Sequence, residues 1–226
     1  MIIYGKQLLF HLIDSHKEKI NKIYLAKEVD TPTFNKISRV GVKIEKLDFK
    51  KAQAMARGGN HQGFLAEVDE FEFASLDELK KGSFLAILYG LSDVGNIGAI
   101  TRTAYALGVD GLIVVTKSLA IEGIIRSSSG AAYELPICVV EDGLSLLNEL
   151  KQTGFTLYAA ASGGADVSKA KFAEKKALIM GSEGEGIPNR ALKKCDENIG
   201  IKMKRSFDSL NVSVAFGIIC DRMVNG

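Results

Sequence analysis

Short apolar segments alternate with helix-like stretches along residues 83–226, and this alternation constrains the fold more than any other feature of the chain. Uninterrupted apolar runs predict strands, and apolar residues recurring near every 3.6 positions predict helices. Strands separated by helices pair in parallel, so we expect an α/β domain with helices on both faces of one sheet. Strands are expected at 84–89, 111–115, 136–140, 155–161, 176–181 and 198–203, with helices near 96–107, 122–127, 142–152, 188–194 and 209–224.

The front of the chain reads as a separate, smaller α/β unit by the same criteria. Its strands are expected at 22–26, 42–47 and 63–68, and its helices near 5–15, 31–39 and 48–57. A polar, acidic segment then interrupts the pattern. We therefore divide the chain into a domain at 1–68, a linker at 69–82 and a domain at 83–226, although a short helix covering the junction would fit the linker sequence equally well.

Composition limits the environment in which the protein works. Apolar runs such as 84–89 are far shorter than the roughly 18–20 residues of a membrane span, and the N-terminus lacks the features of a signal peptide. Cys138, Cys195 and Cys220 are odd in number and have no CxxC spacing, which argues against disulfides and structural zinc. We expect a soluble cytoplasmic protein with reduced cysteines, no membrane contact and no metal.

Positive charge is concentrated in the front unit. Residues 1–68 contain 12 Lys and Arg against 7 Asp and Glu, a net charge of +5, whereas the rest of the chain has 17 against 20. Basic surfaces attract polyanions such as nucleic acid, but a solvated lysine-rich surface has the same composition. Charge alone leaves both interpretations open.

Several enzyme classes are excluded by residues that the larger domain lacks. The chain has three histidines, His11, His16 and His61, and all lie in the front unit, so residues 83–226 cannot assemble a Ser-His-Asp triad or a His-ligated zinc site. The chain has no G-x-x-x-x-G-K-[ST] run. Its glycines at 181, 184 and 186 read G-x-x-G-x-G and come late in the domain, which does not match the dinucleotide-binding fingerprint.

Three blocks of polar and glycine residues each lie at the end of an apolar element, where a packed core has no use for them. They indicate a ligand site at the edge of the sheet. Glycines after the strand at 176–181 allow a ligand to approach the backbone, or simply form a turn. Asn96, Ser209 and Asn211 suit polar contacts with a ligand or helix N-caps, and Arg102 suits an anion or a surface ion pair. The blocks span 96–104, 181–188, and 201–203 with 209–215.

The three blocks resemble, in order, the motifs of the SpoU (TrmH) family of RNA 2′-O-ribose methyltransferases. The resemblance rests on Asn-x-Gly-x-x-x-Arg at 96–102, Gly-x-Glu-x-x-Gly at 181–186, and Ile-x-Met at 201–203 with Ser-Leu-Asn-Val-Ser-Val-Ala at 209–215. Tyr4-Gly5 and the Gly-Asn-His-Gln-Gly run at 59–63 resemble the substrate-binding domain that many members carry. One departure is Lys202, which stands where the family usually has proline.

The resemblance implies a SPOUT catalytic domain, an α/β parallel-sheet fold whose C-terminal segment forms a trefoil knot, preceded by a small α/β RNA-binding domain. It also implies a homodimer that binds S-adenosylmethionine. By similarity, the cofactor contacts fall on Gly181, Ile201, Met203 and Leu210. The resemblance implies Arg102 as the central catalytic residue, with Asn96, Glu183, Ser209 and Asn211 as orienting groups. Arg102 acts either as the general base, as proposed for the family, or by stabilising charge on the attacking 2′-oxygen, which we favour because a guanidinium resists deprotonation.

The front domain resembles that of family members that act on large-subunit ribosomal RNA. We therefore expect a guanosine of that RNA as the substrate, with transfer RNA as the second candidate. Two other classes stay open: an RNA-binding ribosome-assembly factor without turnover, and a base methyltransferase of the knotted superfamily, such as a guanine-N1 enzyme. The latter would need a carboxylate as general base and would lack the Ser209-Leu210-Asn211 sequence.

Overall fold

The computed structural model describes residues 1–182, 184–205 and 209–226, and it divides into two compact units. The first unit comprises Met1–Glu72 together with Ile121–Gly130, and the second comprises Phe73–Ala120 and Ala131–Gly226. The boundary between Glu72 and Phe73 lies inside the segment 69–82. The units are not two continuous stretches of sequence, because Ile121–Gly130 belongs to the same unit as the front of the chain.

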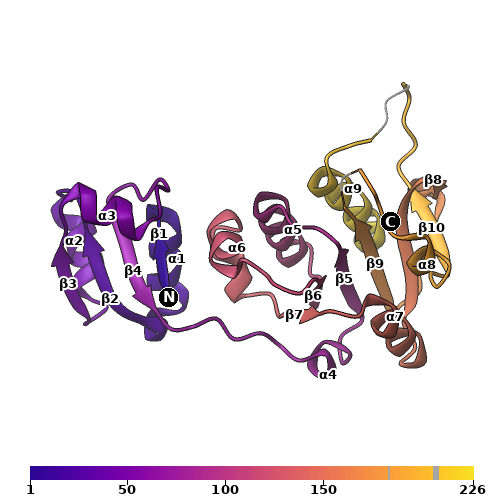
Figure 1. Ribbon diagram of the computed structural model, residues 1–226, viewed down its shortest axis with the longest axis horizontal. Helices are drawn as coiled ribbons and strands as arrows, with labels where there is room; N and C mark the ends of the chain where they lie inside the picture. Colours follow the sequence, from indigo (N-terminus) through magenta and orange to yellow (C-terminus); the bar gives the residue numbers. More distant parts are fainter. Residues whose placement is uncertain (183, 206–208) are drawn as a thin grey trace. The chain divides into compact units, whose positions relative to one another are not determined.

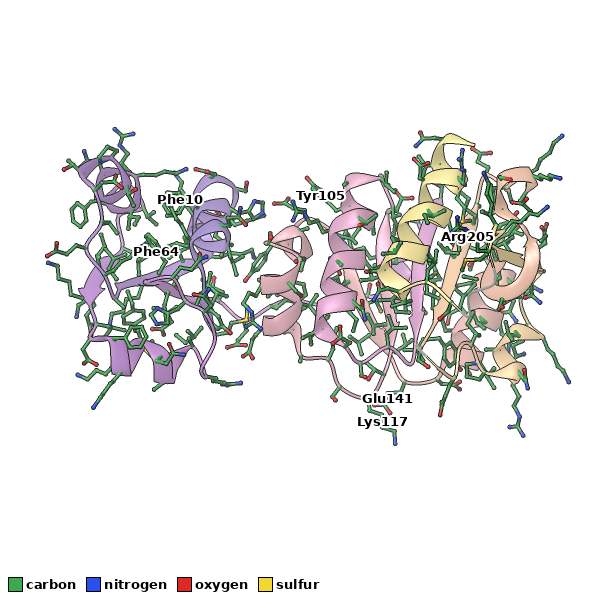
Figure 2. All side chains as sticks on the ribbon, turned by 90° about the horizontal axis from the view of Figure 1, so that it is seen from above. Phe10, Phe64, Tyr105, Lys117, Glu141 and Arg205 are labelled. Carbon is green, nitrogen blue, oxygen red and sulfur yellow. The ribbon has the colours of Figure 1, made fainter. Side chains whose placement is uncertain are left out.

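The first unit contains a four-stranded sheet in the order β1-β4-β2-β3 (Figure 1). Strands β2 and β3 are parallel, whereas β4 runs antiparallel to both β1 and β2. Its core includes Leu9, Leu12 and Phe64, and the Phe64 ring packs edge to face with Phe10 at 6.0 Å (Figure 2). Its elements are β1 (Ile2–Tyr4), α1 (Lys6–Ser15), the 3₁₀ helix η1 (Lys17–Lys19), β2 (Ile20–Leu25), α2 (Thr31–Ser38), β3 (Lys43–Lys46), α3 (Phe49–Met55), β4 (Phe64–Val68) and α6 (Ile121–Ser127).

The second unit contains a six-stranded, all-parallel sheet in the order β10-β8-β9-β5-β6-β7. The predicted α/β class with a parallel sheet is confirmed. Its elements are α4 (Leu76–Leu79), β5 (Phe84–Tyr89), α5 (Val94–Ala106), β6 (Gly111–Val115), η2 (Ala131–Tyr133), β7 (Ile137–Val140), α7 (Gly143–Gln152), β8 (Thr156–Asp166), η3 (Val167–Lys169), β9 (Lys176–Gly181), α8 (Asn189–Leu192), β10 (Glu197–Gly200) and α9 (Val212–Asn225).

Both faces of this sheet are covered, as the uninterrupted apolar strands require. Leu85 and Ile87 of β5 share one core with residues of α4, α7 and α8. Ala86 and Leu88, which alternate with them along the strand, are equally buried and face the opposite way. Helices α5 and α9 pack against each other, with α9 also against β9, and cover that second face (Figure 1).

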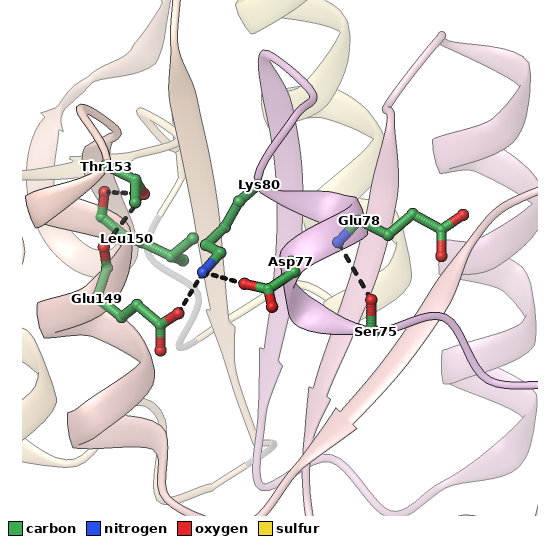
Figure 3. A network of polar contacts seen from close by, with 7 residues as sticks. All are labelled: Ser75, Asp77, Glu78, Lys80, Glu149, Leu150 and Thr153. Carbon is green, nitrogen blue, oxygen red and sulfur yellow. Dashed lines mark hydrogen bonds and ion pairs between the residues drawn. The ribbon is translucent and has the colours of Figure 1, made fainter.

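The second half of the segment 69–82 folds with the second unit. Ser75 caps α4 by accepting a hydrogen bond from the Glu78 N–H, and Leu79 is buried in the core next to α7. Lys80 then forms ion pairs with Asp77 and with Glu149 of α7 (Figure 3). These contacts hold α4 against α7.

We therefore expect a chain that begins at Phe73 to be more stable than one that begins at Ser83. Exposing the pocket left by Leu79 forfeits about 1.5–3 kcal/mol of apolar burial, which corresponds to a melting temperature lower by roughly 5–10 °C for a unit of this size. Thermal unfolding followed by circular dichroism measures the difference. Equal melting temperatures would show that α4 adds nothing to the stability of this unit.

The cysteines are buried or half-buried and reduced. Burial raises the pKa of Cys195 to about 11 and that of Cys220 to about 12, so both thiols stay protonated at neutral pH. Within the described residues, no helix combines the length and apolar character needed to cross a membrane.

Candidate active site

A cavity of about 740 Å³ opens in the second unit, where β8, β9 and β10 reach their carboxyl ends. Four parts of the chain line it. They are β8 (160–164 and Asp166), the end of β9 with the turn after it (180–182, 184 and 186), the end of β10 with the segment after it (199–203, 209 and 210), and α9 (Val212, Ala215 and Ile219). Ligands of parallel α/β sheets bind at this end of the strands. Its volume falls within the range of about 300–1,000 Å³ that is usual for small-molecule and cofactor sites. Residues expected at the site that line it are Gly181, Ile201, Met203, Ser209 and Leu210.

Glycines let the cavity walls close on one another. A Cβ at Gly181 would lie 2.2 Å from the carbonyl carbon of Gly186, and one at Gly164 would lie 2.6 Å from that of Ile199. These distances are shorter than real Cβ contacts, so only glycine fits. Six of the described lining residues are glycines, and at these positions the wall is backbone, which can present amide donors and carbonyl acceptors to a ligand.

The turn after β9 needs glycine for its conformation as well. Gly184 and Gly186 have φ values of 90° and 68°, and the Gly186 N–H donates to the Ser182 carbonyl at 3.0 Å. The turn conformation thus requires glycine at 184 and 186, whereas the close approach of the backbone requires it at 181. Glu183, predicted as an orienting group, lies outside the described residues.

Among the residues that the structure describes, the charged ones lining the cavity are Asp166 and Lys202. The Ser168 hydroxyl and backbone N–H both donate to the Asp166 carboxylate, at 2.7 and 3.0 Å. These hydrogen bonds, helped by the charges of Lys169 and Lys202, lower the pKa of Asp166, so the carboxylate is ionised at neutral pH. An ionised carboxylate can accept hydrogen bonds from ribose hydroxyls or from an ammonium group.

Asn96 and Asn211 meet where α5 and α9 begin. The Asn211 amide group donates from Nδ2 to Asn96 Oδ1 at 3.0 Å. Its own Oδ1 caps α9 by accepting from the Ser213 and Val214 N–H groups. The same side chain therefore caps one helix and ties it to the other.

Asn96 is not the N-cap of its helix, which corrects the expectation from the sequence. Helix α5 begins two residues earlier, at Val94, and the Asp93 carboxylate accepts the Asn96 N–H at 2.7 Å. A carboxylate at this position also suits the helix dipole. With the cap supplied by Asp93, the Asn96 side chain is left to bond Asn211.

Arg102 lies on α5 two turns after Asn96, and its side chain is exposed. Among the described residues it makes no ion pair or side-chain hydrogen bond, so the surface ion pair considered for it does not form there. Nor does it line the cavity of its own chain. The structure thus joins Asn96 to Asn211 and leaves the guanidinium available to an anion from outside.

The part of the cavity wall that β8 supplies is not predicted from the sequence. Residues 160–164 and Asp166 line the cavity, and none of the three polar blocks includes them. The available signal was the run of six small residues at 159–164, which lies inside β8. Such residues leave room for the close approach of β10, whose register against β8 shifts between Asn198 and Ile199.

Comparison with known proteins relates both units to one family. Residues 83–221 match the model of the SpoU rRNA Methylase family. The chain belongs to this family. Residues 2–74 match a second model, RNA 2′-O ribose methyltransferase substrate binding. Membership makes the chain an S-adenosylmethionine-dependent RNA methyltransferase.

Relatives of this SpoU family member extend over nearly its whole length. It is 33% identical to the 23S rRNA (guanosine-2′-O-)-methyltransferase RlmB of Pasteurella multocida, over 96% of this chain and 94% of that protein. RlmB of Vibrio vulnificus is 32% identical, over 96% of this chain and 93% of that protein.

Solved structures share the fold. The SpoU methyltransferase AviRb from Streptomyces viridochromogenes, in complex with AdoMet, aligns with a TM-score of 0.80 at 23% identity over 99% of this chain and 89% of that one. An AdoMet-bound rRNA methyltransferase from Sinorhizobium meliloti aligns with a TM-score of 0.77 at 22% identity, over 98% and 85%.

Proposed function

We propose that this protein transfers the methyl group of S-adenosylmethionine to a ribose 2′-hydroxyl of RNA, on a guanosine of large-subunit ribosomal RNA. The observation that carries the proposal is the glycine-rich cavity at the carboxyl ends of the strands, next to the Asn96–Asn211 pair. The relatives matched over the full chain are 23S rRNA guanosine-2′-O-methyltransferases. Transfer RNA is the second candidate, and an assembly factor without turnover is the third. The cytoplasm is the proposed location.

The residues of the cavity fit an adenosyl group. Gly181, Ile201 and Leu210 offer backbone and apolar contacts suited to adenine, and Met203 adds a polarisable side chain. Asp166 is an acceptor for ribose hydroxyls or for the ammonium of the methionine moiety. The bound cofactor supplies an electrophilic methyl group on a sulfonium. Lys202 replaces a usual proline, yet it leaves the backbone of the neighbouring segment able to make these contacts.

Arg102 is the proposed stabiliser of charge on the attacking oxygen. A neutral ribose hydroxyl is a weak nucleophile, and negative charge develops on its oxygen as the carbon–oxygen bond forms. A guanidinium stays protonated in proteins, so it stabilises that charge or the adjacent phosphate instead of removing the proton. Asn96 and Asn211 fix the start of α5, and Ser209 and Glu183 are proposed to position the ribose.

A homodimer is the proposed form of the active enzyme. Val214 and Ile218 are exposed, at 51% and 38%, and lie one turn apart on α9, and Tyr105 is exposed on α5 (Figure 2). Exposed apolar side chains on two helices that pack against each other suit a surface that a second copy covers. Arg102 lies on the same α5 and would complete the cavity of the partner. A trefoil knot in the C-terminal segment is part of the same proposal.

The test is calorimetry with S-adenosylmethionine in the presence of a chelator, followed by mapping of 2′-O-methylated nucleotides in cells with and without the protein. We expect one cofactor site per chain, unaffected by chelation, and loss of one guanosine modification in large-subunit RNA. Binding that disappears with chelation would contradict the cofactor assignment. A lost modification in transfer RNA alone would move the substrate to the second candidate.

A further inference from the structure

Two side chains of opposite charge line the cavity of the second unit, and its other described lining residues are uncharged. The two are Asp166, at the end of β8, and Lys202, in the segment after β10. Charges that face a ligand site are arranged to complement charges on the ligand, because a charge that loses water without finding a partner is costly. This pair therefore favours a ligand that has both a cationic and an anionic group.

The backbone brings these two residues to one part of the cavity wall. Gly200 of β10 is the register partner of Asp166 in β8, and Lys202 follows two residues later. A Cβ at Gly200 would lie 2.8 Å from the Ala161 carbonyl oxygen, so the end of β10 runs close against β8. After the hydrogen bonds from Ser168, the charges that lower the pKa of Asp166 include that of Lys202. The two opposite charges thus lie within reach of one small ligand group.

Both charged groups retain hydrogen-bonding capacity for a ligand. The Ser168 hydroxyl and N–H both donate to Oδ1 of Asp166, and no donor among the described residues reaches its Oδ2. Lys202 is exposed, and within the same part of the chain its ammonium makes no ion pair or hydrogen bond. The Ser168 contacts hold the carboxylate in one direction, whereas the flexible lysine stem can follow a ligand.

S-adenosylmethionine carries its charges at one end. Adenine and ribose are neutral, whereas the methionine moiety has an ammonium and a carboxylate on the same carbon. A carboxylate of the protein accepts from the first and an ammonium of the protein donates to the second, and hydrogen bonds between ionised groups are stronger than those between neutral ones. Contact of Asp166 with ribose hydroxyls instead would separate it from the charged end that Lys202 complements.

We propose that Asp166 and Lys202 together bind the amino-acid end of the cofactor: Asp166 accepts from its ammonium, and Lys202 donates to its carboxylate. The inference rests on the proposed function and assigns the two residues a part in cofactor affinity. Proline, the usual residue of the family at position 202, has no cation to offer. The contact with the carboxylate is therefore a feature of this chain, and it gives the departure from the family motif a role in recognition.

The test is calorimetry of the full chain with three ligands that differ in these groups. S-adenosylhomocysteine has both the ammonium and the carboxylate and no sulfonium. Decarboxylated S-adenosylmethionine lacks the carboxylate, and methylthioadenosine lacks the whole amino-acid group. Each variant is compared with the wild-type chain for the same ligand, so that differences among the ligands themselves cancel.

Lys202→Gln is expected to weaken binding of S-adenosylhomocysteine by about tenfold, the scale of one lost charge-assisted hydrogen bond. It should bind decarboxylated S-adenosylmethionine at least as tightly as wild type, because that ligand has no carboxylate. The matched control is Lys169→Gln, since the charge of Lys169 also acts on Asp166 but the residue does not line the cavity. Equal affinities of the two lysine variants for S-adenosylhomocysteine would overturn the inference.

Asp166→Asn is expected to weaken binding of S-adenosylhomocysteine by about tenfold and to leave that of methylthioadenosine within about twofold of wild type. Its control is Asp142→Asn, because Asp142 likewise accepts from the N–H and hydroxyl of one serine, Ser145, and caps α7 outside the cavity. The control should bind both ligands normally. An equal loss of both ligands in the Asp166 variant would place this carboxylate on the ribose and overturn the inference.

The wild-type chain separates failure of this inference from failure of the proposed function. Equal affinity for S-adenosylhomocysteine and methylthioadenosine would overturn the inference, because the amino-acid group would then contribute nothing, yet it would leave the cavity as the cofactor site. A wild-type chain that binds neither S-adenosylmethionine nor S-adenosylhomocysteine would overturn the proposed function itself.

Discussion

Arg102→Ala is expected to lower the turnover number by about 100-fold or more while cofactor affinity stays within about threefold of wild type. This is the scale for removing one group that stabilises charge in a transition state. The guanidinium is exposed and outside the cavity of its own chain, so its loss should not disturb the cofactor. Single-turnover methyl transfer and calorimetry measure the two quantities.

The control for this prediction is Arg190→Ala, which removes an exposed arginine from α8 of the same unit. Both variants should unfold at the wild-type temperature, since neither side chain contributes to the core. If turnover by the Arg102 variant equals that of the Arg190 variant, the arginine is a surface residue and has no part in catalysis.

A mixing experiment tests whether Arg102 acts in the active site of the partner. Arg102→Ala chains keep an intact cavity, and chains with an altered cavity keep Arg102. Mixed dimers of the two would contain one complete site if the arginine crosses the interface, so part of the activity should return. Within one chain the two defects would not complement each other.

The strand positions could be predicted closely because burial on both faces leaves an uninterrupted apolar run. Expected strands at 84–89, 111–115 and 176–181 coincide with β5, β6 and β9. Strand β1 has only three residues, too few for a periodic signal, and gains its place by pairing with β4. The expected strand at 198–203 ends at Gly200, because the residues after it leave the sheet to line the cavity.

The site could be predicted in part, and the reason lies in the range of its contacts. The glycine block around Gly181 indicates a ligand site by itself, whereas Ile201 and Leu210 follow only from the resemblance to the family motifs. Asp166 was missed because its position depends on the register of β8 against β10. The hydrogen bond between Asn96 and Asn211 joins residues 115 positions apart, so local sequence does not predict it. It also depends on Asp93 capping α5, because an Asn96 side chain used as the cap would not be available to Asn211.

Gly181→Ala is expected to reduce cofactor affinity by about 10- to 100-fold. A methyl group at this position would lie 2.2 Å from the Gly186 carbonyl carbon and 2.3 Å from the Ile187 nitrogen, both backbone atoms that cannot turn aside. The turn after β9 must move, and relief of such overpacking costs about 1–3 kcal/mol. Because this turn is one wall of the cavity, the displacement weakens cofactor binding directly. Calorimetry gives the affinity, and thermal unfolding without cofactor shows whether the whole unit is weakened.

The matched control is Gly217→Ala on α9, where the new methyl group would meet only Thr103 Cγ2, at 3.8 Å. Alanine favours a helix by about 0.5–1 kcal/mol over glycine, so this variant should be at least as stable as wild type and bind the cofactor normally. The contrast isolates the backbone contact at Gly181 from the general effect of adding a methyl group. Wild-type cofactor affinity in the Gly181 variant would mean that the turn adjusts freely. The close approach of Gly181 to the backbone of Gly186 and Ile187 would then not be what shapes the cofactor cavity.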